Sequence, residues 1–196
     1  EIVFWEAAVD RVEGKVRDEF PCPHCGAMVK KDSLERAWEY VHDEALRETV
    51  RRAKQVPVLI NYSVGKKRFE KMPDEGDLDL LDRIEMKAIP YWHPTDELPE
   101  GYNTEQPKKS HGVTHVHQFY SKRNLLLLTC AHSKIVKCDD RTLFTWLTSS
   151  MIRTSKLYKF TLDRKMGTVS GTLYIPSLWT ENSVIKLLKY KLNNFK

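Results

Sequence analysis

The stretch Pro107–Lys137, which reads PKKSHGVTHVHQFYSKRNLLLLTCAHSKIVK, decides how the rest of this chain is organised. It opens with cations and histidines, passes through Phe119 and Tyr120, and then enters a long apolar run. Ser121 stands directly before that run, and serine is a preferred helix N-cap, so we predict that a buried helix begins here. A loop rich in hydrogen-bond donors is therefore attached to a core element, which is how binding sites are usually mounted.

Hydrophobic periodicity places the other elements along the chain. We predict helices over 34–45, 74–87, 121–137 and 139–155 and one starting near residue 181, hairpins over 2–20 and 55–71, a strand over 167–175, and a proline-rich loop over 89–107. The expected fold class is α+β, with an N-terminal zinc-ribbon-like hairpin followed by a mixed domain of helices and short strands. We divide the chain into a half zinc ribbon (1–31), an α+β segment with the second hairpin and the proline-rich loop (32–106), and a basic, mainly helical segment (107–196).

The bulk composition predicts where the protein resides. No apolar run approaches the roughly 20 residues of a membrane helix. The first residues contain no basic leader before an apolar core, so we expect no signal peptide. The sequence starts in a predicted strand without an initiator Met, so we expect a fragment of a longer chain. The four cysteines are unevenly placed and do not form a disulfide framework, which favours a cytoplasmic protein.

Charge is distributed unevenly between the two halves. Residues 1–106 hold 16 Lys and Arg against 23 Asp and Glu, whereas residues 107–196 hold 16 against 4, a net charge of +12. Such an excess is typical of a protein that binds a polyanion, and the alternative is a basic face that only keeps the protein soluble. We favour nucleic acid, because the cations coincide with the aromatic, histidine-rich loop.

Cys22 and Cys25 form a Cys-Pro-His-Cys-Gly knuckle. A strand pair that leads into Cys-x-x-Cys-Gly is typical of the second half of a zinc ribbon, in which glycine lets backbone amides turn toward the thiolates. A closed zinc site needs four ligands, so we expect the missing pair just before Glu1. The rival ligands within the chain are His24, Cys130 and Cys138. A redox pair is the other alternative, although no thioredoxin-like context follows the motif.

A second metal hypothesis concerns the histidines. His115 and His117 are two residues apart, so on a strand they point to the same face and form a chelate, with His111 and His132 nearby in sequence. A hydrolytic site of this kind also needs carboxylates, or a third histidine held by second-shell acceptors. Acidic residues are scarce after residue 106, which disfavours a metal-dependent hydrolase.

Three segments carry a resemblance to a known family. The run Lys109–Leu128, the upstream segment Asn61–Lys71 (NYSVGKKRFEK) and the downstream segment Ser170–Ser177 (SGTLYIPS) resemble the middle part of prokaryotic site-specific DNA methyltransferases, as found in restriction-modification systems. In that family a zinc-ribbon-bearing insertion separates the cofactor-binding and catalytic motifs. The chain contains no Pro-Pro, so the catalytic Asp/Asn-Pro-Pro-Tyr/Phe tetrapeptide is absent, and it also lacks a glycine-rich S-adenosylmethionine loop. We therefore expect this fragment alone to be inactive.

The resemblance implies the target-recognition segment of an enzyme that methylates adenine N6 or cytosine N4. Zinc is then the cofactor of this segment, S-adenosylmethionine binds only the full-length enzyme, and the partners are double-stranded DNA and the flanking methyltransferase core. Charge alone assigns the contacts. The expected phosphate ligands are Lys108, Lys109, Ser110, Lys122, Arg123 and Arg153, and the expected polar readers of bases are His115, His117 and Asn124.

Two of these cations stand where a helix disfavours them. Lys122 and Arg123 fall in the first turn of the predicted helix, where positive charge opposes the helix dipole, so we predict a binding role for them. Two other functions stay open at this point: a free-standing zinc-ribbon adaptor for protein or nucleic acid, and the His-x-His hydrolase.

Overall fold

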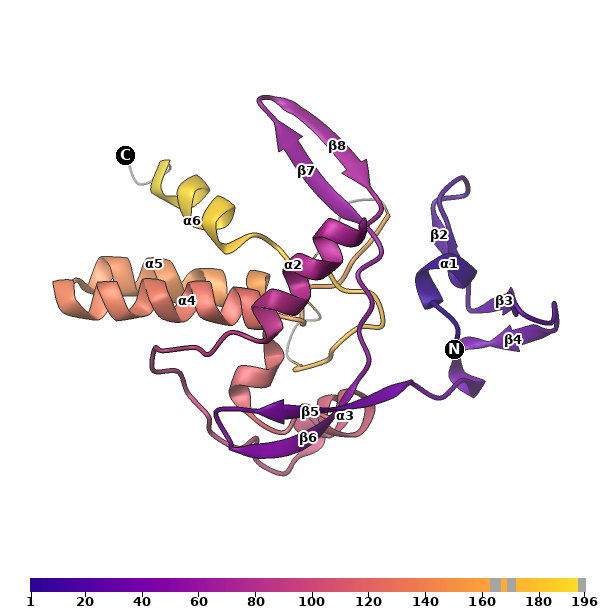
Figure 1. The fold of residues 1–196 in the computed structure, drawn as a ribbon, viewed down its shortest axis with the longest axis horizontal. Coiled ribbons are helices and arrows are strands. Elements are labelled where there is room, and N and C mark those ends of the chain that lie inside the picture. The colour runs from indigo at the N-terminus through magenta and orange to yellow at the C-terminus, as the bar shows by residue number, and fades with distance from the viewer. Residues whose placement is uncertain (163–166, 169–171, 194–196) are drawn as a thin grey trace. The chain divides into compact units, whose positions relative to one another are not determined.

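The computed structural model describes residues 1–162, 167–168 and 172–193 (Figure 1). The chain forms two compact units, and we describe each by itself. The first unit comprises Glu1–Ala37 and Lys54–Lys87, and the second comprises Trp38–Ala53 and Ala88–Lys196. The fold class is α+β, as predicted, and the strands of the described residues pair into four separate two-stranded antiparallel sheets.

The first unit opens with a short helix rather than a strand. Its elements are α1 (Phe4–Ala8), β1 (Val9–Asp10), β2 (Lys15–Val16), β3 (Glu19–Pro21), β4 (Met28–Lys30) and the 3-10 turn η1 (Lys31–Ser33). The predicted hairpin over 2–20 is therefore wrong in its first strand. Phe4 packs edge-to-face on the fully buried Phe20 with ring centroids 5.7 Å apart, and a helical turn is what brings it there.

The second part of this unit follows the prediction. β7 (Ile60–Val64) and β8 (Lys67–Lys71) form the hairpin expected over 55–71, and Gly65 turns it with φ +60°. The helix α2 (Glu75–Glu85) matches the one expected over 74–87. It begins with a capping box in which Asp74 and Asp77 each accept the other's backbone N–H, at 3.0 and 2.9 Å.

The predicted helix over 34–45 is wrong, because this sequence forms a hairpin of the second unit. β5 (Trp38–Asp43) pairs with β6 (Glu48–Ala53) in a register that sets Trp38 opposite Ala53. Trp38 and Val41 satisfy a helical spacing, but the cross-strand contacts favour the sheet. The Arg51 guanidinium lies 3.8 Å from the centroid of the Trp38 ring, and Glu39 accepts from Arg52 Nε at 2.7 Å.

A helix, α3 (Tyr102–His111), replaces the end of the predicted proline-rich loop. Its sequence is polar and contains Pro107, so periodicity gives no helical signal. Tertiary contacts hold it instead. The Gln106 side chain donates to the carbonyl of Ile175 at 2.9 Å and accepts from its N–H at 3.0 Å, as a neighbouring strand would. Thr104 Oγ1 donates to Pro99 O at 2.6 Å.

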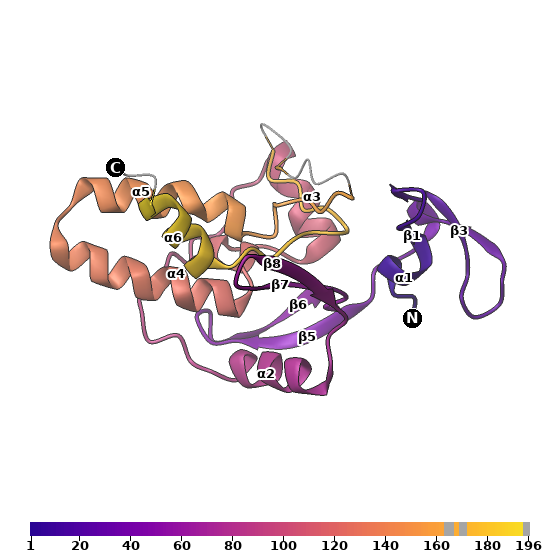
Figure 2. The same cartoon turned by 90° about the horizontal axis from the view of Figure 1, so that it is seen from above.

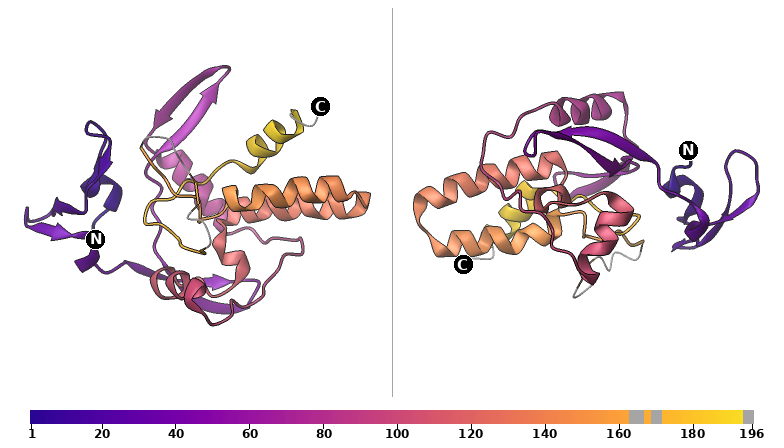
Figure 3. Two further views of the ribbon diagram at one scale, coloured as in Figure 1. Left: turned by 180° about the vertical axis from the view of Figure 1, so that it is seen from behind. Right: turned by 90° about the horizontal axis from the view of Figure 1, so that it is seen from below.

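Three helices supply most of the core of the second unit. They are α4 (Lys122–Ile135), α5 (Arg141–Met151) and α6 (Val184–Asn193), in agreement with the helices expected from 121, 139 and 181. α4 and α5 lie side by side, and α6 packs against both (Figures 2 and 3). The shared core comprises Leu128, Ile135, Trp146, Leu147 and Val184.

The second unit also contains short 3-10 turns and a second apolar cluster. The 3-10 turns are η2 (Val116–Phe119), η3 (Val136–Cys138) and η4 (Ile152–Thr154). The second cluster comprises Leu98, Val113, Phe119 and Ile175. Residues 169–171 of the predicted strand over 167–175 lie outside the described residues; Gly167 forms one isolated bridge with Lys159, and 172–175 are not in a strand.

Gly112 ends α3 in a conformation that no other residue tolerates at this position. Its φ is +68°, and a Cβ added there would lie 2.1 Å from the backbone oxygen of Arg51 in β6. We expect Gly112→Ala to lower the free energy of unfolding by about 3 kcal/mol, because left-handed strain adds to a clash with backbone.

Gly65→Ala is the matched control. Gly65 also has a positive φ, but no atom lies within 4 Å of the added Cβ, so the loss should stay near 1 kcal/mol. Chemical denaturation followed by circular dichroism measures both variants. Equal losses would contradict the close approach of α3 to β6.

Candidate functional site

The cysteine knuckle connects β3 to β4. Gly26 turns the loop with φ +74°, its N–H donates to Cys22 O at 2.8 Å, and Cys22 N–H donates to Ala27 O at the same distance. Backbone hydrogen bonds from His24 and Cys25 lower the pKa of the Cys22 thiol. The loop therefore favours a thiolate, the form that binds a metal ion.

The knuckle supplies two thiol ligands. His24 Nε2 is 2.9 Å from the carbonyl oxygen of Glu1, a contact that occupies this nitrogen as a donor. Within the described ranges, no group of three or more His, Cys, Asp or Glu side chains is arranged to hold a metal ion. Cys22 and Cys25 thus fit half of the ligand set of a structural zinc ion.

Asp43, at the end of β5, accepts four hydrogen bonds through its carboxylate. Its Oδ1 accepts from the backbone N–H groups of Ala45 and Leu46 at 3.1 and 3.3 Å, which closes the β5–β6 turn. Its Oδ2 accepts from His117 Nε2 at 2.8 Å and from Gln118 Nε2 at 3.0 Å. One side chain thereby joins the hairpin to the turn η2.

These contacts fix the ionisation of Asp43. Burial would raise its pKa, but the hydrogen bonds from His117, Gln118 and Leu46 outweigh burial and hold the pKa well below the ordinary value. With the carboxylate ionised, the Nε2 proton stays on His117, whose side chain is 6% exposed. Sequence reasoning missed the contact of Asp43 with His117 and Gln118, because no local pattern links residues 74 and 75 positions apart.

The histidines of the hydrolase hypothesis do not share one site. His115 and His117 lie with ring centroids 6.0 Å apart, and His93 lies 5.7 Å from His117. His111 lies at the end of α3, and its Nδ1 forms a hydrogen bond with Ser110 Oγ at 2.8 Å. His132 lies in α4, and its ring centroid is 5.5 Å from that of Trp92. The buried Nδ1 of His117 has no hydrogen-bond partner among the described residues.

Two of the predicted base readers are structural. Asn124 is 1% exposed, and its Nδ2 donates to the carbonyls of Thr154 at 2.9 Å and Asn182 at 3.0 Å. It ties α4 to η4 and to the segment before α6. His117 is held by Asp43, as described above. Neither side chain is available to read a base in this structure, and His115 is half-buried with its Nδ1 2.9 Å from Thr114 Oγ1.

The predicted phosphate ligands of α3 differ in exposure. Lys108 forms an ion pair with Glu100 at 2.5 Å and is 16% exposed. Lys109 pairs with Glu105 one turn earlier but is 75% exposed. The Ser110 hydroxyl donates to Gln106 O at 2.6 Å, so it is already occupied within the helix.

The first turn of α4 carries its own counter-ions. Ser121 caps the helix by accepting from Asn124 N–H at 3.3 Å, and its hydroxyl donates to Glu181 at 2.5 Å. Arg123 Nε donates to the same Glu181 oxygen at 3.0 Å, and Lys122 lies 3.6 Å from Glu44. These carboxylates offset the repulsion between the cations and the helix dipole, so the dipole gives no separate reason for a binding role.

Arg153, in η4, is exposed and forms no ion pair within the described part of the chain. Lys191 of α6 lies close to it. Burial, and then the positive charge of Arg153, lower the pKa of Lys191. Two cations thus meet here without a carboxylate between them, which makes this the least compensated of the predicted phosphate-contacting positions.

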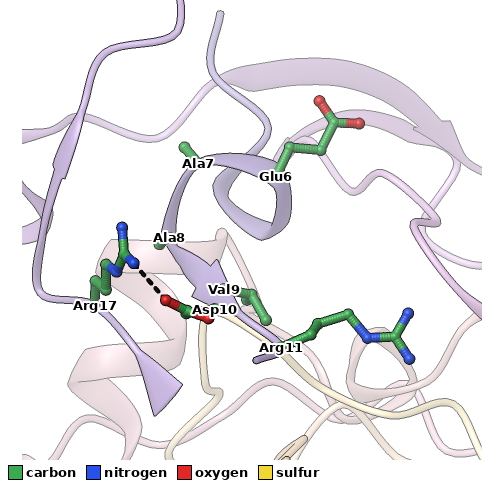
Figure 4. Close-up of a pocket in the computed structure, with 7 residues that line it drawn as sticks. All are labelled: Glu6, Ala7, Ala8, Val9, Asp10, Arg11 and Arg17. Carbon is green, nitrogen blue, oxygen red and sulfur yellow. Dashed lines mark hydrogen bonds and ion pairs between the residues drawn. The ribbon is translucent and has the colours of Figure 1, made fainter. Parts of the chain in front are cut away.

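A hollow in the first unit carries no independent site. It is lined by Glu6, Ala7, Ala8, Val9, Asp10, Arg11 and Arg17 (Figure 4). The Asp10 carboxylate pairs with Arg17 and accepts from the N–H groups of Val12 and Glu13 at 3.0 and 2.9 Å. Its charge is therefore used to hold the β1–β2 turn.

We expect Asp43→Asn to lower the free energy of unfolding by about 2 kcal/mol at pH 7, because charge-assisted hydrogen bonds are lost. Since the folded-state pKa of Asp43 lies below the ordinary value of about 3.9, the stabilisation is complete above pH ~4 and is lost as the pH falls further. The difference in the free energy of unfolding between Asp43→Asn and the parent should therefore become smaller as the pH falls below about 4.

Thermal unfolding at a series of pH values measures this gap. Asp96→Asn is the control, because Asp96 is exposed in the same unit and the change removes the same charge. A gap for Asp43→Asn that stays constant down to pH 3 would show that its carboxylate is not the stabilising group.

Comparisons with known proteins add no relative. No family model, no curated protein and no solved structure matches the chain. None of the helices in the described part of the chain combines the length and hydrophobicity of a bilayer-spanning helix.

Proposed function

We propose that this chain is the zinc-ribbon and target-recognition segment of an S-adenosylmethionine-dependent DNA methyltransferase, and that its second unit binds double-stranded DNA. Methyl transfer to adenine N6 or cytosine N4 then takes place in flanking parts of the enzyme, which carry the motifs absent from this sequence. The resemblance of Lys109–Leu128 and of the two other segments to that family supports this assignment.

The charge of the second unit is the observation that carries DNA binding. Its residues hold 19 Lys and Arg against 12 Asp and Glu, a net of +7, whereas the first unit holds 13 against 15, a net of −2. The excess is smaller than the +12 of residues 107–196, because the acidic segments 38–53 and 88–106 belong to the same unit. A compact body with this excess attracts a polyanion.

The exposed cations are the best candidates for phosphate contacts. Lys109, Arg123 and Arg153 all lie at helix ends or in a turn, and their exposure lets them exchange a surface carboxylate for a phosphate at little cost. Lys108 and Lys122 are 16% and 20% exposed, so they contribute less. Of the five cations predicted from charge to contact phosphate, Lys109, Arg123 and Arg153 therefore stay the main candidates.

The cysteine knuckle supports the zinc-ribbon part of the proposal. Its amide-to-thiol hydrogen bonds favour the thiolate, and zinc would fix the β3–β4 hairpin of a unit whose only buried apolar residues among those described are Ala8 and Phe20. Under the proposal the other two ligands come from outside the described residues. The adaptor function shares this zinc site but requires no duplex binding.

A titration of this chain with a labelled duplex of about 20 bp tests the function. We expect binding whose logarithmic dependence on salt is steep. In Lys109→Gln/Arg123→Gln the slope should fall by about 1.8, since each lost phosphate contact removes about 0.9.

Lys30→Gln is the control, because Lys30 is 73% exposed and also belongs to an ion pair, but lies in the first unit. Fluorescence anisotropy at several salt concentrations measures all three proteins. No binding by the parent chain would refute the proposed function and favour the adaptor. Equal loss in the control would refute the assignment of the contacts.

Metal analysis tests the ribbon. We expect zinc in a protein extended upstream by about 30 residues, enough for a second cysteine pair at ribbon spacing, and loss of that zinc in Cys22→Ser/Cys25→Ser. Cys138→Ser, which changes an exposed cysteine of the second unit, should retain it. Zinc that persists in the double variant would place the metal elsewhere and overturn this part of the proposal.

A further inference from the structure

The β7–β8 hairpin of the first unit is exposed along almost its whole length. Ile60 pairs with Lys71 and Val64 with Lys67 across an uninterrupted antiparallel ladder, and every residue from 61 to 70 is exposed. Figure 1 shows the two strands as a narrow ribbon that ends in a turn. Gly65 lies in this turn. A ribbon of this kind presents both faces and its tip to a partner.

The two faces of the ribbon differ in chemistry. Alternation along the strands places Tyr62, Val64, Lys67 and Phe69 on one face. The rings of Tyr62 and Phe69 stack across the strands with centroids 5.4 Å apart and an interplanar angle of 24°, which stiffens the ribbon. The opposite face consists of polar side chains, namely Asn61, Ser63, Arg68 and Glu70.

The tip carries uncompensated positive charge. Lys66, Lys67 and Arg68 form no ion pair with any described residue. This separates them from Lys108 and Lys109 of α3 and from Lys122 and Arg123 of α4, each of which has a carboxylate partner. Glu70, the one acid of the ribbon, is itself paired with Arg11 of the first unit.

The base of the ribbon is anchored. Lys71 Nζ lies 2.7 Å from carboxylate oxygens of both Asp74 and Asp77, the two residues of the α2 capping box. These hydrogen bonds raise the pKa of Lys71, so it stays charged. A ribbon with a stiff middle and a fixed base holds its tip in a defined direction.

Protection of a sheet edge is the other reading of such lysines. Edge-protecting charges lie along a strand, where they block pairing with another chain. Here Lys66 lies in the turn, and Lys67 and Arg68 follow it directly, so the charge gathers where the ladder ends. The placement fits a tip that contacts an anion better than it fits a protected edge.

We propose that the β7–β8 hairpin is an arm that enters the major groove of duplex DNA, with Lys66, Lys67 and Arg68 on backbone phosphates. This inference rests on the proposed DNA-binding function and adds a contact surface in the first unit. The major groove of B-form DNA is about 12 Å wide and admits a two-stranded ribbon. The polar face with Asn61 and Ser63 then faces the base edges, Arg68 extends from that face to the phosphates, and the Tyr62 face turns away from the bases.

The groove also identifies the kind of nucleic acid. The major groove of A-form RNA is deep and narrow, so a ribbon of two strands cannot enter it. The arm should therefore contribute to binding of duplex DNA and much less to binding of duplex RNA of equal length.

The test is Lys66→Gln/Lys67→Gln/Arg68→Gln in the whole chain, measured by anisotropy on duplex DNA and duplex RNA across a salt series. On DNA we expect the salt slope to fall by up to about 2.7 and the affinity at moderate salt to fall more than about tenfold. Circular dichroism checks that the ribbon and Gly65 turn are retained.

Lys15→Gln/Lys30→Gln/Lys87→Gln is the matched control, because it removes the same charge from exposed positions of the same unit. Its slope should equal that of the parent. If the parent binds DNA and the tip variant binds equally well, the arm is refuted while the DNA-binding function stands. Equal losses in the tip variant and the control, or equal losses on DNA and RNA, also refute groove entry. If the parent binds no duplex, the DNA-binding function fails, and the arm fails with it.

Discussion

The second unit depends on the carboxylate of Asp43. This one group closes the β5–β6 turn through Oδ1 and holds His117 and Gln118 through Oδ2. Gln118 in turn accepts from the N–H groups of Thr114 and His115 at 2.8 and 3.1 Å. These hydrogen bonds explain why residues 38–53 belong to the second unit, although the residues on both sides of them in the sequence belong to the first. A hairpin of two strands has too little core to be stable alone.

Folding changes the electrostatic character that the sequence displays. Basic residues after 106 form ion pairs with carboxylates of earlier segments. Lys122 at the start of α4 pairs with Glu44, and Lys108 of α3 pairs with Glu100. Paired cations that are also largely buried, such as Lys108 and Lys122, become weaker candidates for binding. Arg153 and, in the other unit, Lys66, Lys67 and Arg68 at the tip of the β7–β8 hairpin form no ion pair with a described residue.

The sequence predicts those parts whose signal is local. α2, α4 and α5 follow from apolar periodicity and capping residues, and the β7–β8 turn follows from Gly65. The 34–45 segment misleads, because Trp38 and Val41 fit a helical period while cross-strand packing decides for the sheet. α3 has no apolar stripe at all. The Asp43–His117 contact joins residues 74 positions apart, which single-sequence reasoning cannot pair.

The same separation has a consequence during synthesis. At about 5 to 20 residues per second, a ribosome needs about 4 to 15 s to advance from Asp43 to His117. During that interval the β5–β6 hairpin is synthesised without the histidine and glutamine that hold its turn. The nascent chain therefore gains the last contacts of this hairpin only after α3 has been synthesised.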